Sequence, residues 1–513
     1  MTIHPRLRTL TGFLSVAAML AIAGCSNALG TPADAGTTSD KITLGISRQI
    51  TSLDPGDAGS LDSDASVQKA IFSGLTRYDA DFVLHGELAE KWAQDSPTQW
   101  TFTLRSGVKF SNGEAFDAPV AKWNFDRVLD PAAKFGQGGS LRPVIDEVEA
   151  PDATTLVIHT KGSYIDLPDR LSNFLFTEQK FAASHNTKTE TLGTGPYVLD
   201  SVDLENGAKL TANPNYFGDK PAFNKAEYVV LSTETARVQA IQAGTVDAAI
   251  QFEPSDLKQF SDSTDYTTGN QWSTWNMSLR FNETVKPLDD VRVRQALNYA
   301  IDKKAIIRSI FGADIEPLKG QLISEPFDAI NPELKPYEFD PAKAKELLAA
   351  AGHADGLELE LGLSTGTYVA QDPIAQVIAD QLKNVGVTLK ITNQPFPAWV
   401  TRTYSEKDAP ALYYIGYTSG YKAPAERLRI FTSTGSQSHY ASPEYDDLIK
   451  KLTVAATPVD QQALVNEATE LFRDQAHAAF LWPQPLTYVV KKDVSWKPRA
   501  EHWLVPQEFS PAS

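Results

Sequence analysis

The chain has a single cysteine, Cys25, and only three methionines and eight histidines among 513 residues. One cysteine excludes an internal disulfide and any zinc site built from paired cysteines. The histidines are scattered, without the close spacing of a ligand set, and the chain has no Walker A sequence and no His-Glu-x-x-His motif. We therefore expect a protein without a metal site or cofactor, and one that is not an enzyme.

The chain also has fewer basic than acidic residues: 47 Lys and Arg against 64 Asp and Glu, which gives a net charge of −17. Nucleic-acid binding depends on neutralising phosphates with Lys and Arg, so this composition argues against a nucleic-acid partner. Beyond the first 25 residues no apolar run is long enough to span a bilayer as a helix. We expect the membrane to be contacted only through the N-terminus.

The N-terminus has the features of an export signal. Arg6 and Arg8 precede a short apolar run, and small residues close it. Ile22-Ala23-Gly24-Cys25 resembles the lipobox of bacterial lipoproteins, which implies cleavage before Cys25 and lipidation of its sulfur. We expect residues 1–24 to be a lipoprotein signal peptide and 25–40 a lipid-bearing flexible tether. The protein would then be extracytoplasmic, anchored to a bacterial membrane by Cys25. An ordinary signal peptide with an incidental cysteine is the alternative.

Helix and strand signals alternate along the rest of the chain. Asp340-Pro341, Asp372-Pro373 and Thr457-Pro458 each place a capping side chain before a proline and an apolar helical pattern. Trp100 to Leu104 alternates as a half-buried strand does. Cutting after residue 24 leaves 513 − 24 = 489 residues, more than one core of about 250–300 residues holds. These patterns predict an α/β protein with at least two lobes.

Several motifs follow one another along the chain in a characteristic order. They are Ile71–Tyr78, Leu88–Trp92, Trp100–Arg105, Gly107–Phe110, Asn112-Gly113, Gly193–Tyr197, Asn213–Tyr216, Asp290–Leu297, Ala300–Asp302, Tyr337, Asp340-Pro341 and Lys343–Gly352. Taken in this order, they are similar to family 5 extracellular solute-binding proteins, the oligopeptide-, dipeptide- and nickel-binding group of bacterial ABC importers. The resemblance covers residues 41–490.

The resemblance implies a two-lobe hinged clamp of the periplasmic-binding-protein type II class, with an extra subdomain in the first lobe. Lobe I would comprise residues 41–79, 191–275 and 490–513, its inserted subdomain 80–190, and lobe II 276–489. The chain would cross between lobes near Asn270–Asn282 and return near Val489–Asp493. The resemblance also implies a monomer that closes on a small solute and docks on a membrane permease driven by an ATPase.

At the ligand site the chain departs from its peptide-binding relatives. They carry Gly-Trp, two residues and an Asp that pairs with the peptide amino group, whereas this chain has Gly416-Tyr417-Thr418-Ser419-Gly420. Because a buried ammonium needs an anionic partner, the ligand would be a peptide paired elsewhere, a modified peptide, an opine or an oligosaccharide. The candidate ligand-binding residues are Gly59, Ser60, Trp275, Trp399, Tyr417, Ser419, Gly420 and Tyr421. The aromatic members are equally suited to packing a core.

Two other functions remain open. Gly362-Leu363-Ser364-Thr365-Gly366 matches the Gly-x-Ser-x-Gly elbow of serine hydrolases, which requires a strand, the serine on a sharp turn, and a helix immediately after. The next helix start, Asp372-Pro373, comes eight residues after Ser364. A secreted serine hydrolase using Ser364 is one alternative, and a non-transport receptor or chaperone with the same clamp is the other.

Overall fold

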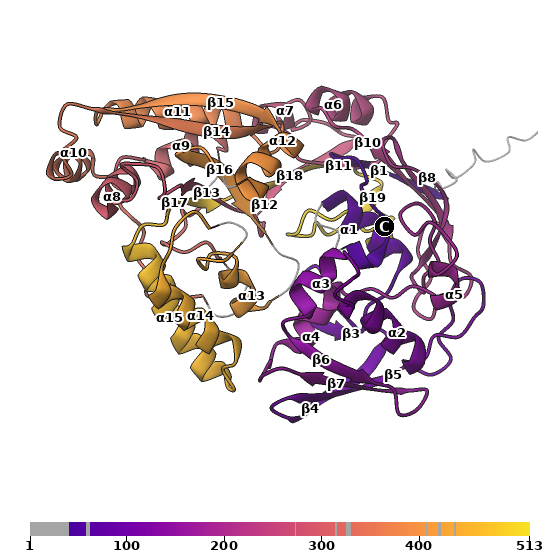
Figure 1. Ribbon diagram of the computed structural model, residues 1–513. Helices are drawn as coiled ribbons and strands as arrows, with labels where there is room; N and C mark the ends of the chain where they lie inside the picture. Colours follow the sequence, from indigo (N-terminus) through magenta and orange to yellow (C-terminus); the bar gives the residue numbers. More distant parts are fainter. Residues whose placement is uncertain are drawn as a thin grey trace, which may run out of the picture. The chain divides into compact units, whose positions relative to one another are not determined.

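Figure 1 shows the computed structural model of the protein. It describes residues 40–57, 62–271, 273–312, 315–324, 330–406, 408–418, 422–435 and 438–512. Cys25 and the rest of the expected signal and tether, up to residue 39, lie outside the described residues. Within the described ranges, none of the helices combines the length and apolar character needed to traverse a bilayer.

A seven-stranded mixed sheet, with strand order β12-β18-β11-β1-β10-β9-β8, forms the first lobe. Its central strand β1 pairs in parallel with both β10 and β11, and Ile42, Leu44 and Ile46 of β1 are almost fully buried. The strands are β1 (Lys41–Ile46), β8 (Tyr197–Asp203), β9 (Gly207–Ala212), β10 (Lys225–Val230), β11 (Ala248–Ile250), β12 (Tyr266–Gln271) and β18 (Leu486–Lys491). Accompanying elements are α1 (Asp62–Ile71), α6 (Glu234–Gln242), α7 (Pro254–Leu257), β19 (Val494–Trp496) and β20 (Phe509–Pro511).

A separate antiparallel sheet, with order β4-β5-β7-β6, has its own core and lies within residues 80–190. Trp100, Phe102 and Leu104 of β5 are buried on one face, which confirms the strand expected from their alternation. The strands are β4 (Ala89–Ser96), β5 (Gln99–Leu104), β6 (Ile145–Glu149) and β7 (Thr155–Thr160), and a hairpin of β2 (Thr76–Tyr78) and β3 (Leu84–Gly86) precedes them. The helices are α2 (Ala118–Leu129), α3 (Gly136–Leu141), α4 (Leu167–Arg170) and α5 (Gln179–Ala182).

The second lobe is built on a five-stranded sheet, with order β15-β14-β16-β13-β17. Asp340 and Thr457 cap their helices as expected, whereas the helix near Asp372-Pro373 begins earlier, at Gln371, because a proline is tolerated inside the first turn. The strands are β13 (Asn276–Phe281), β14 (Leu357–Thr365), β15 (Val387–Pro395), β16 (Leu412–Tyr417) and β17 (Ala478–Pro483). The helices are α8 (Val291–Tyr299), α9 (Lys303–Ile310), α10 (Pro341–Ala350), α11 (Gln371–Lys383), α12 (Phe396–Val400), α13 (Pro424–Arg429), α14 (Pro443–Thr453) and α15 (Pro458–Asp474).

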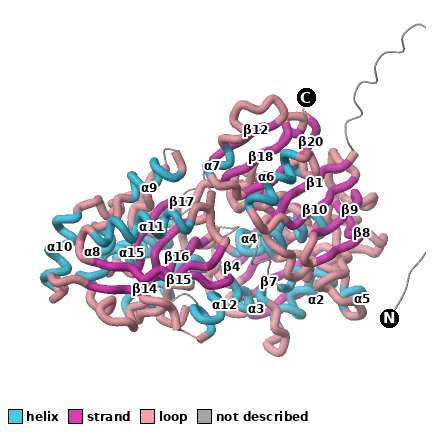
Figure 2. Tube along the Cα trace, turned by 90° about the horizontal axis from the view of Figure 1, so that it is seen from above, coloured by secondary structure: helices cyan, strands magenta, loops and turns pink. Residues whose placement is uncertain are grey.

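The chain passes between the two large sheets twice. It leaves the first sheet after β12 and enters the second at β13, and it returns between β17 and β18, where Pro483-Gln484-Pro485 interrupts two apolar strands. Val489, which was assigned to the second lobe, therefore lies in β18 of the first-lobe sheet. Figure 2 shows the strands of the two sheets as separate groups. The expected α/β architecture of two lobes is present in the described part of the chain.

The two crossings are bonded to each other. The backbone N–H of Gln484 donates to the carbonyl of Trp275 at 2.7 Å, and the Ser273 hydroxyl donates to the Gln484 carbonyl. On either side, β12 pairs with β18 and β13 with β17. The connection between the lobes is thus a nearly continuous two-stranded ribbon.

Candidate functional site

Trp275, at the end of the first crossing, is where side chains of both lobes meet. Its indole stacks on the imidazole of His502, with ring centroids 5.6 Å apart and planes at 24°. Tyr368 of the second lobe packs edge-on against it at 5.7 Å, and the Arg48 guanidinium of the first lobe lies 5.5 Å from its centroid. Four distant segments of the chain therefore converge on one indole.

Polar contacts of Arg48 and Glu253 hold the lobes together beside this indole. Arg48, just after β1, donates from Nη2 to the Thr367 carbonyl at 3.0 Å and pairs through Nη1 with Asp62 at 3.4 Å. Glu253 accepts the backbone N–H of Ala370 at 2.8 Å. Both contacts reach the loop between β14 and α11, so this loop is fastened to the first lobe.

Two buried polar atoms at this junction lack a partner among the described residues. They are Nε1 of Trp275 and Nε2 of His502, whose residues are 9% and 2% exposed. Burial lowers the pKa of His502 to about 4, so its ring is neutral at pH 7. Because buried polar groups are nearly always hydrogen-bonded, these two atoms are natural contacts for a bound molecule or an ordered water.

A second set of contacts joins the lobes between α4 and α13. Arg170 is held by both carboxylate oxygens of Asp166, at 3.0 and 3.1 Å, and lies 3.5 Å from Glu426 of the second lobe. Glu426 in turn pairs with Arg429 at 2.6 Å. These charges form an alternating chain of acid and base across the junction, which neutralises each of them at close range.

Tyr417 lies half-buried at the end of β16, next to the first crossing. Its ring meets Phe431 edge-on at 5.6 Å, and the Arg427 guanidinium lies 5.7 Å from its centroid. Burial raises the pKa of its hydroxyl. The adjacent Thr418 hydroxyl shares a 2.5 Å hydrogen bond with that of Thr274. The β16 end is therefore fixed to the crossing, with an aromatic ring and a buried cation beside it.

The structure brings Trp275 and Tyr417 to the region where the lobes meet, while Trp399 packs in the second-lobe core at 1% exposure, against Tyr404 and Tyr413. The remaining candidates lie outside the described residues and stay predictions: Gly59, Ser60, Ser419, Gly420 and Tyr421.

Sequence reasoning did not single out Arg48, His502, Arg170 or Glu426. Of these, only Arg48 could have been found from the local sequence, because it follows the carboxyl end of a buried parallel strand, where ligands commonly bind.

Ser364 does not occupy a nucleophile elbow. It lies within β14 at 0% exposure, and its hydroxyl has no hydrogen-bond partner among the described residues. No helix follows at once, since α11 begins at Gln371, whose side chain donates to the Ser364 carbonyl at 2.7 Å. The described residues also contain no group of three or more His, Cys, Asp or Glu side chains placed to hold a metal ion.

Comparison with known proteins identifies the family. The model of bacterial extracellular solute-binding proteins, family 5 (middle region), matches residues 83–439. The nickel-binding periplasmic protein of Escherichia coli K12 is 31% identical over 351 residues, which cover 64% of this chain and 66% of that protein. The glutathione-binding protein of Escherichia coli K12 is 26% identical over 487 residues, covering 91% and 92%.

Solved structures share the fold. An ABC transporter substrate-binding protein from Listeria monocytogenes superposes with a TM-score of 0.83 at 20% identity, over 93% of this chain and 100% of that one. The neighbours have the type II periplasmic-binding-protein fold, which confirms the two-lobe clamp. Two lobes joined by a double crossing, with unpartnered polar atoms where they meet, fit the family match over most of the chain. The chain belongs to the bacterial extracellular solute-binding proteins of family 5.

Proposed function

We propose that this protein is the extracytoplasmic solute-binding subunit of an ABC importer. In this proposal a lipid on Cys25 anchors it to the membrane, a small solute is captured between the two lobes, and the closed form delivers it to a permease driven by an ATPase. The two Escherichia coli relatives are both named as binding proteins, which supports the same role here. Capture between lobes works because a ligand that touches both shifts the balance toward the closed form.

The observation that carries this proposal is the junction around Trp275. Arg48 and Glu253 of the first lobe are bonded to the Thr367–Ala370 loop of the second, as in a closed clamp. Closure nevertheless leaves Nε1 of Trp275 and Nε2 of His502 buried, with no hydrogen-bond partner in the part of the protein that the structure describes. In a solute-binding protein, such atoms have a function, because a ligand enclosed at the junction would complete their hydrogen bonds.

We further propose that the solute is a modified peptide, an opine or a short oligosaccharide, with simple peptides bound less well. Gly420 stands where peptide-binding relatives carry the acid for the amino terminus, so a free ammonium would be buried without that partner. Tyr417, half-buried at the end of β16, offers an aromatic ring of the kind that stacks on sugars and planar groups. The two curated relatives are named for nickel and for glutathione, so the family fold accepts chemically different ligands.

Native mass spectrometry of protein released from its own membrane with mild detergent tests the proposal directly. A small molecule that co-purifies, and that rebinds in calorimetry after removal, is the expected result. Trp275→Phe keeps a six-membered aromatic ring and removes the five-membered ring with its Nε1 donor, so it should weaken rebinding about tenfold, near the upper end for one hydrogen bond.

Trp482→Phe is the matched control, because Trp482 is also fully buried with an unpartnered Nε1 but lies in the second-lobe core. It should leave the affinity unchanged. Equal weakening by both substitutions would show that the Trp275 effect is one of stability, and would remove the junction as the binding site. Cross-linking in intact cells separates an importer from a non-transport receptor, since only the importer should be captured with a permease and an ATPase.

A further inference from the structure

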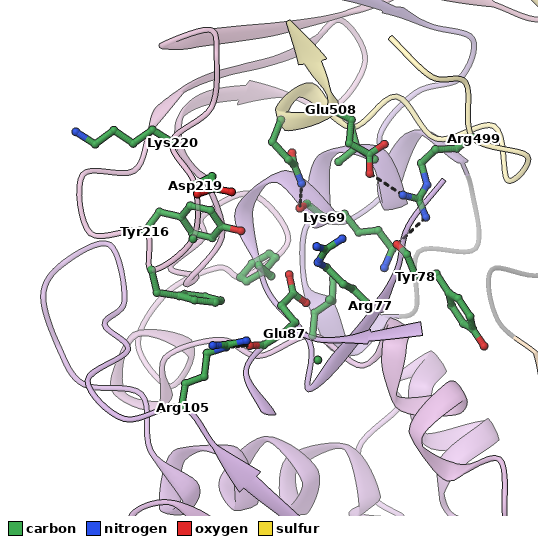
Figure 3. A pocket seen from close by; sticks show the side chains of 17 residues that line it. Lys69, Arg77, Tyr78, Glu87, Arg105, Tyr216, Asp219, Lys220, Arg499 and Glu508 are labelled. Carbon is green, nitrogen blue, oxygen red and sulfur yellow. Dashed lines mark hydrogen bonds and ion pairs between the residues drawn. The ribbon is translucent and has the colours of Figure 1, made fainter. Parts of the chain in front are cut away.

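A cavity away from the junction of the lobes lies entirely within the first lobe and its inserted subdomain. It has a volume of about 530 Å³, and Figure 3 shows its wall side chains. The lining comes from the end of α1, the β2–β3 hairpin, the loop between β9 and β10, and the C-terminal segment. Arg105 and Leu175 add to this lining, so the cavity lies where several separate stretches of the first lobe and its subdomain meet, and none of its lining residues belongs to the second lobe.

Among the described residues, two cations of this cavity have no carboxylate within ion-pair distance, and a third has a single, distant one. Lys69 Nζ donates only to the Ser172 carbonyl, at 3.2 Å, and lies 4.8 Å from the ring centroid of Trp503. Arg105 donates from Nε to a backbone carbonyl at 2.5 Å and reaches a carboxylate only at 3.8 Å, at the exposed rim. The Arg77 guanidinium lies in the middle of the cavity, and Figure 3 shows no interaction joining it to the other side chains drawn there.

The acidic side chains of the cavity do not cancel these charges. Glu508 forms an ion pair with Arg499 at 2.6 Å, and Arg499 also pairs with Glu501 at 2.8 Å. Asp219 and Lys220 are exposed neighbours of opposite sign at the edge.

Glu87 is the one remaining acid of the wall, and its Oε2 accepts the Gly74 N–H at 2.7 Å. Burial raises the pKa of its carboxyl to about 7, so it carries only part of a charge at neutral pH. Five cations and three acids line the cavity, a difference of +2 in a chain whose net charge is −17.

We propose that this cavity is a binding site for a small anion bearing a phosphate or carboxylate group, held by Arg77 and Lys69. A guanidinium and an ammonium that share one anion form charge-assisted hydrogen bonds, the strongest type available to a protein without a metal. Arg105 and the hydroxyl of Tyr216 line the same wall and add donors. The anion would tie α1, the hairpin and the C-terminal segment together, so it would stabilise the first lobe whether or not the clamp holds its solute.

Calorimetry of the full mature protein with inorganic phosphate and with citrate, at constant ionic strength set by chloride, tests the site. We expect saturable binding of at least one of these anions and an upward shift of the melting temperature. Arg77→Gln and Lys69→Met should each weaken binding at least tenfold. Glu87→Gln should tighten binding, because it removes the remaining negative charge without changing the shape of the wall.

Lys220→Gln is the matched control: it removes one cation of the exposed edge and should change the affinity less than twofold. Vesicles of phosphatidylglycerol, compared with neutral vesicles, show whether the phosphate can come from a lipid headgroup; Arg77-dependent binding to the anionic vesicles alone would identify that source. Absence of binding to every probe, or binding that survives both Arg77→Gln and Lys69→Met, overturns the proposal. Solute capture at Trp275 is measured separately and should be unaffected by Arg77→Gln, so the two proposals fail independently.

Discussion

The ion pair between Arg170 and Glu426 joins the lobes, and Glu426→Gln is expected to shift the protein toward an open form. The side chains are 4% and 15% exposed and 3.5 Å apart, so the pair is largely removed from water. Glutamine keeps the shape of the side chain and removes its charge. Arg170 keeps both oxygens of Asp166, so the substitution does not leave a buried cation without a partner.

The size of the effect follows from the geometry. At 3.5 Å and an effective dielectric constant of about 20, the direct attraction is about 5 kcal/mol. Most of this is offset, because Arg429 and Asp166 already neutralise the two charges and because burial costs solvation. A net contribution of about 1.4 kcal/mol is consistent with a partly buried pair of this kind. The closed-to-open ratio should therefore fall about tenfold.

Distances between spin labels on the two lobes, measured by pulsed electron paramagnetic resonance, report this ratio with and without solute. In Glu426→Gln without solute, the long-distance population should grow, and the apparent dissociation constant should rise as the closed fraction falls, by up to about tenfold where the open form already predominates without solute. Glu227→Gln removes an acid paired with Lys41 and Lys209 within the first lobe only, and it should change neither quantity. An unchanged distance distribution with affinity within twofold, or an equal change in Glu227→Gln, would refute the reasoning.

Three further predictions follow from the other features. Cys25→Ala should abolish labelling with a radioactive fatty acid and release the protein from the membrane fraction; persistent label would contradict lipidation. Unmodified di- and tripeptides should bind only at high micromolar concentration or weaker. Micromolar binding corresponds to about −8 kcal/mol, and losing the acid that Gly420 replaces should remove about 2–5 kcal/mol of this binding free energy. Calorimetry against N-acetylated peptides, opines and oligosaccharides measures this, and sub-micromolar binding of a free peptide would refute it. Burial lowers the pKa of His502 to about 4 in the folded protein. Below about pH 6.5 its imidazole is protonated in the unfolded chain but stays neutral in the folded one, so the free energy of unfolding should fall by about 3 kcal/mol by pH 4. Denaturant unfolding from pH 7 to 4 should show this slope reduced in His502→Gln; an identical slope would show that other groups cause it.

Local signals were sufficient for most elements of the fold. The helix starts at Asp340 and Thr457 could be predicted because an N-cap hydrogen bond involves residues three apart, here at 2.9 and 3.1 Å. The return crossing was harder to place. β17 and β18 are both apolar, and only the two prolines between them, Pro483 and Pro485, mark the change of sheet. A pattern of hydrophobicity identifies a strand without saying to which sheet it belongs.

The junction could not be predicted in the same way, because its contacts join residues that are remote in sequence. Arg48 and Thr367 are 319 positions apart, and no periodicity links them. Trp275 was singled out through a family resemblance, whereas its partner His502 lies in a C-terminal segment with no distinctive pattern. Sequence reasoning favoured Tyr417 over Trp399 as a ligand contact but could not place either ring, and the fold separates a half-buried ring beside the crossing from one in the core.

The difference between the lobes and their junction also explains how such a clamp can open. Each lobe has a continuous apolar core, which cannot be separated without exposing a large hydrophobic surface. Several contacts across the junction, those of Arg48, Glu253 and Arg170, are instead polar, and water can replace each of them when the lobes part. Tyr78 and Phe82 also pack with apolar residues of the second lobe, and this smaller apolar contact opposes opening. The two crossings stay bonded to each other through Trp275 and Gln484, so opening needs only a bend of this ribbon. In the proposed clamp, a ligand would have to supply only the few kcal/mol that separate the two forms. Hydrogen bonds to the atoms of Trp275 and His502 that lack a partner among the described residues would contribute to this free energy.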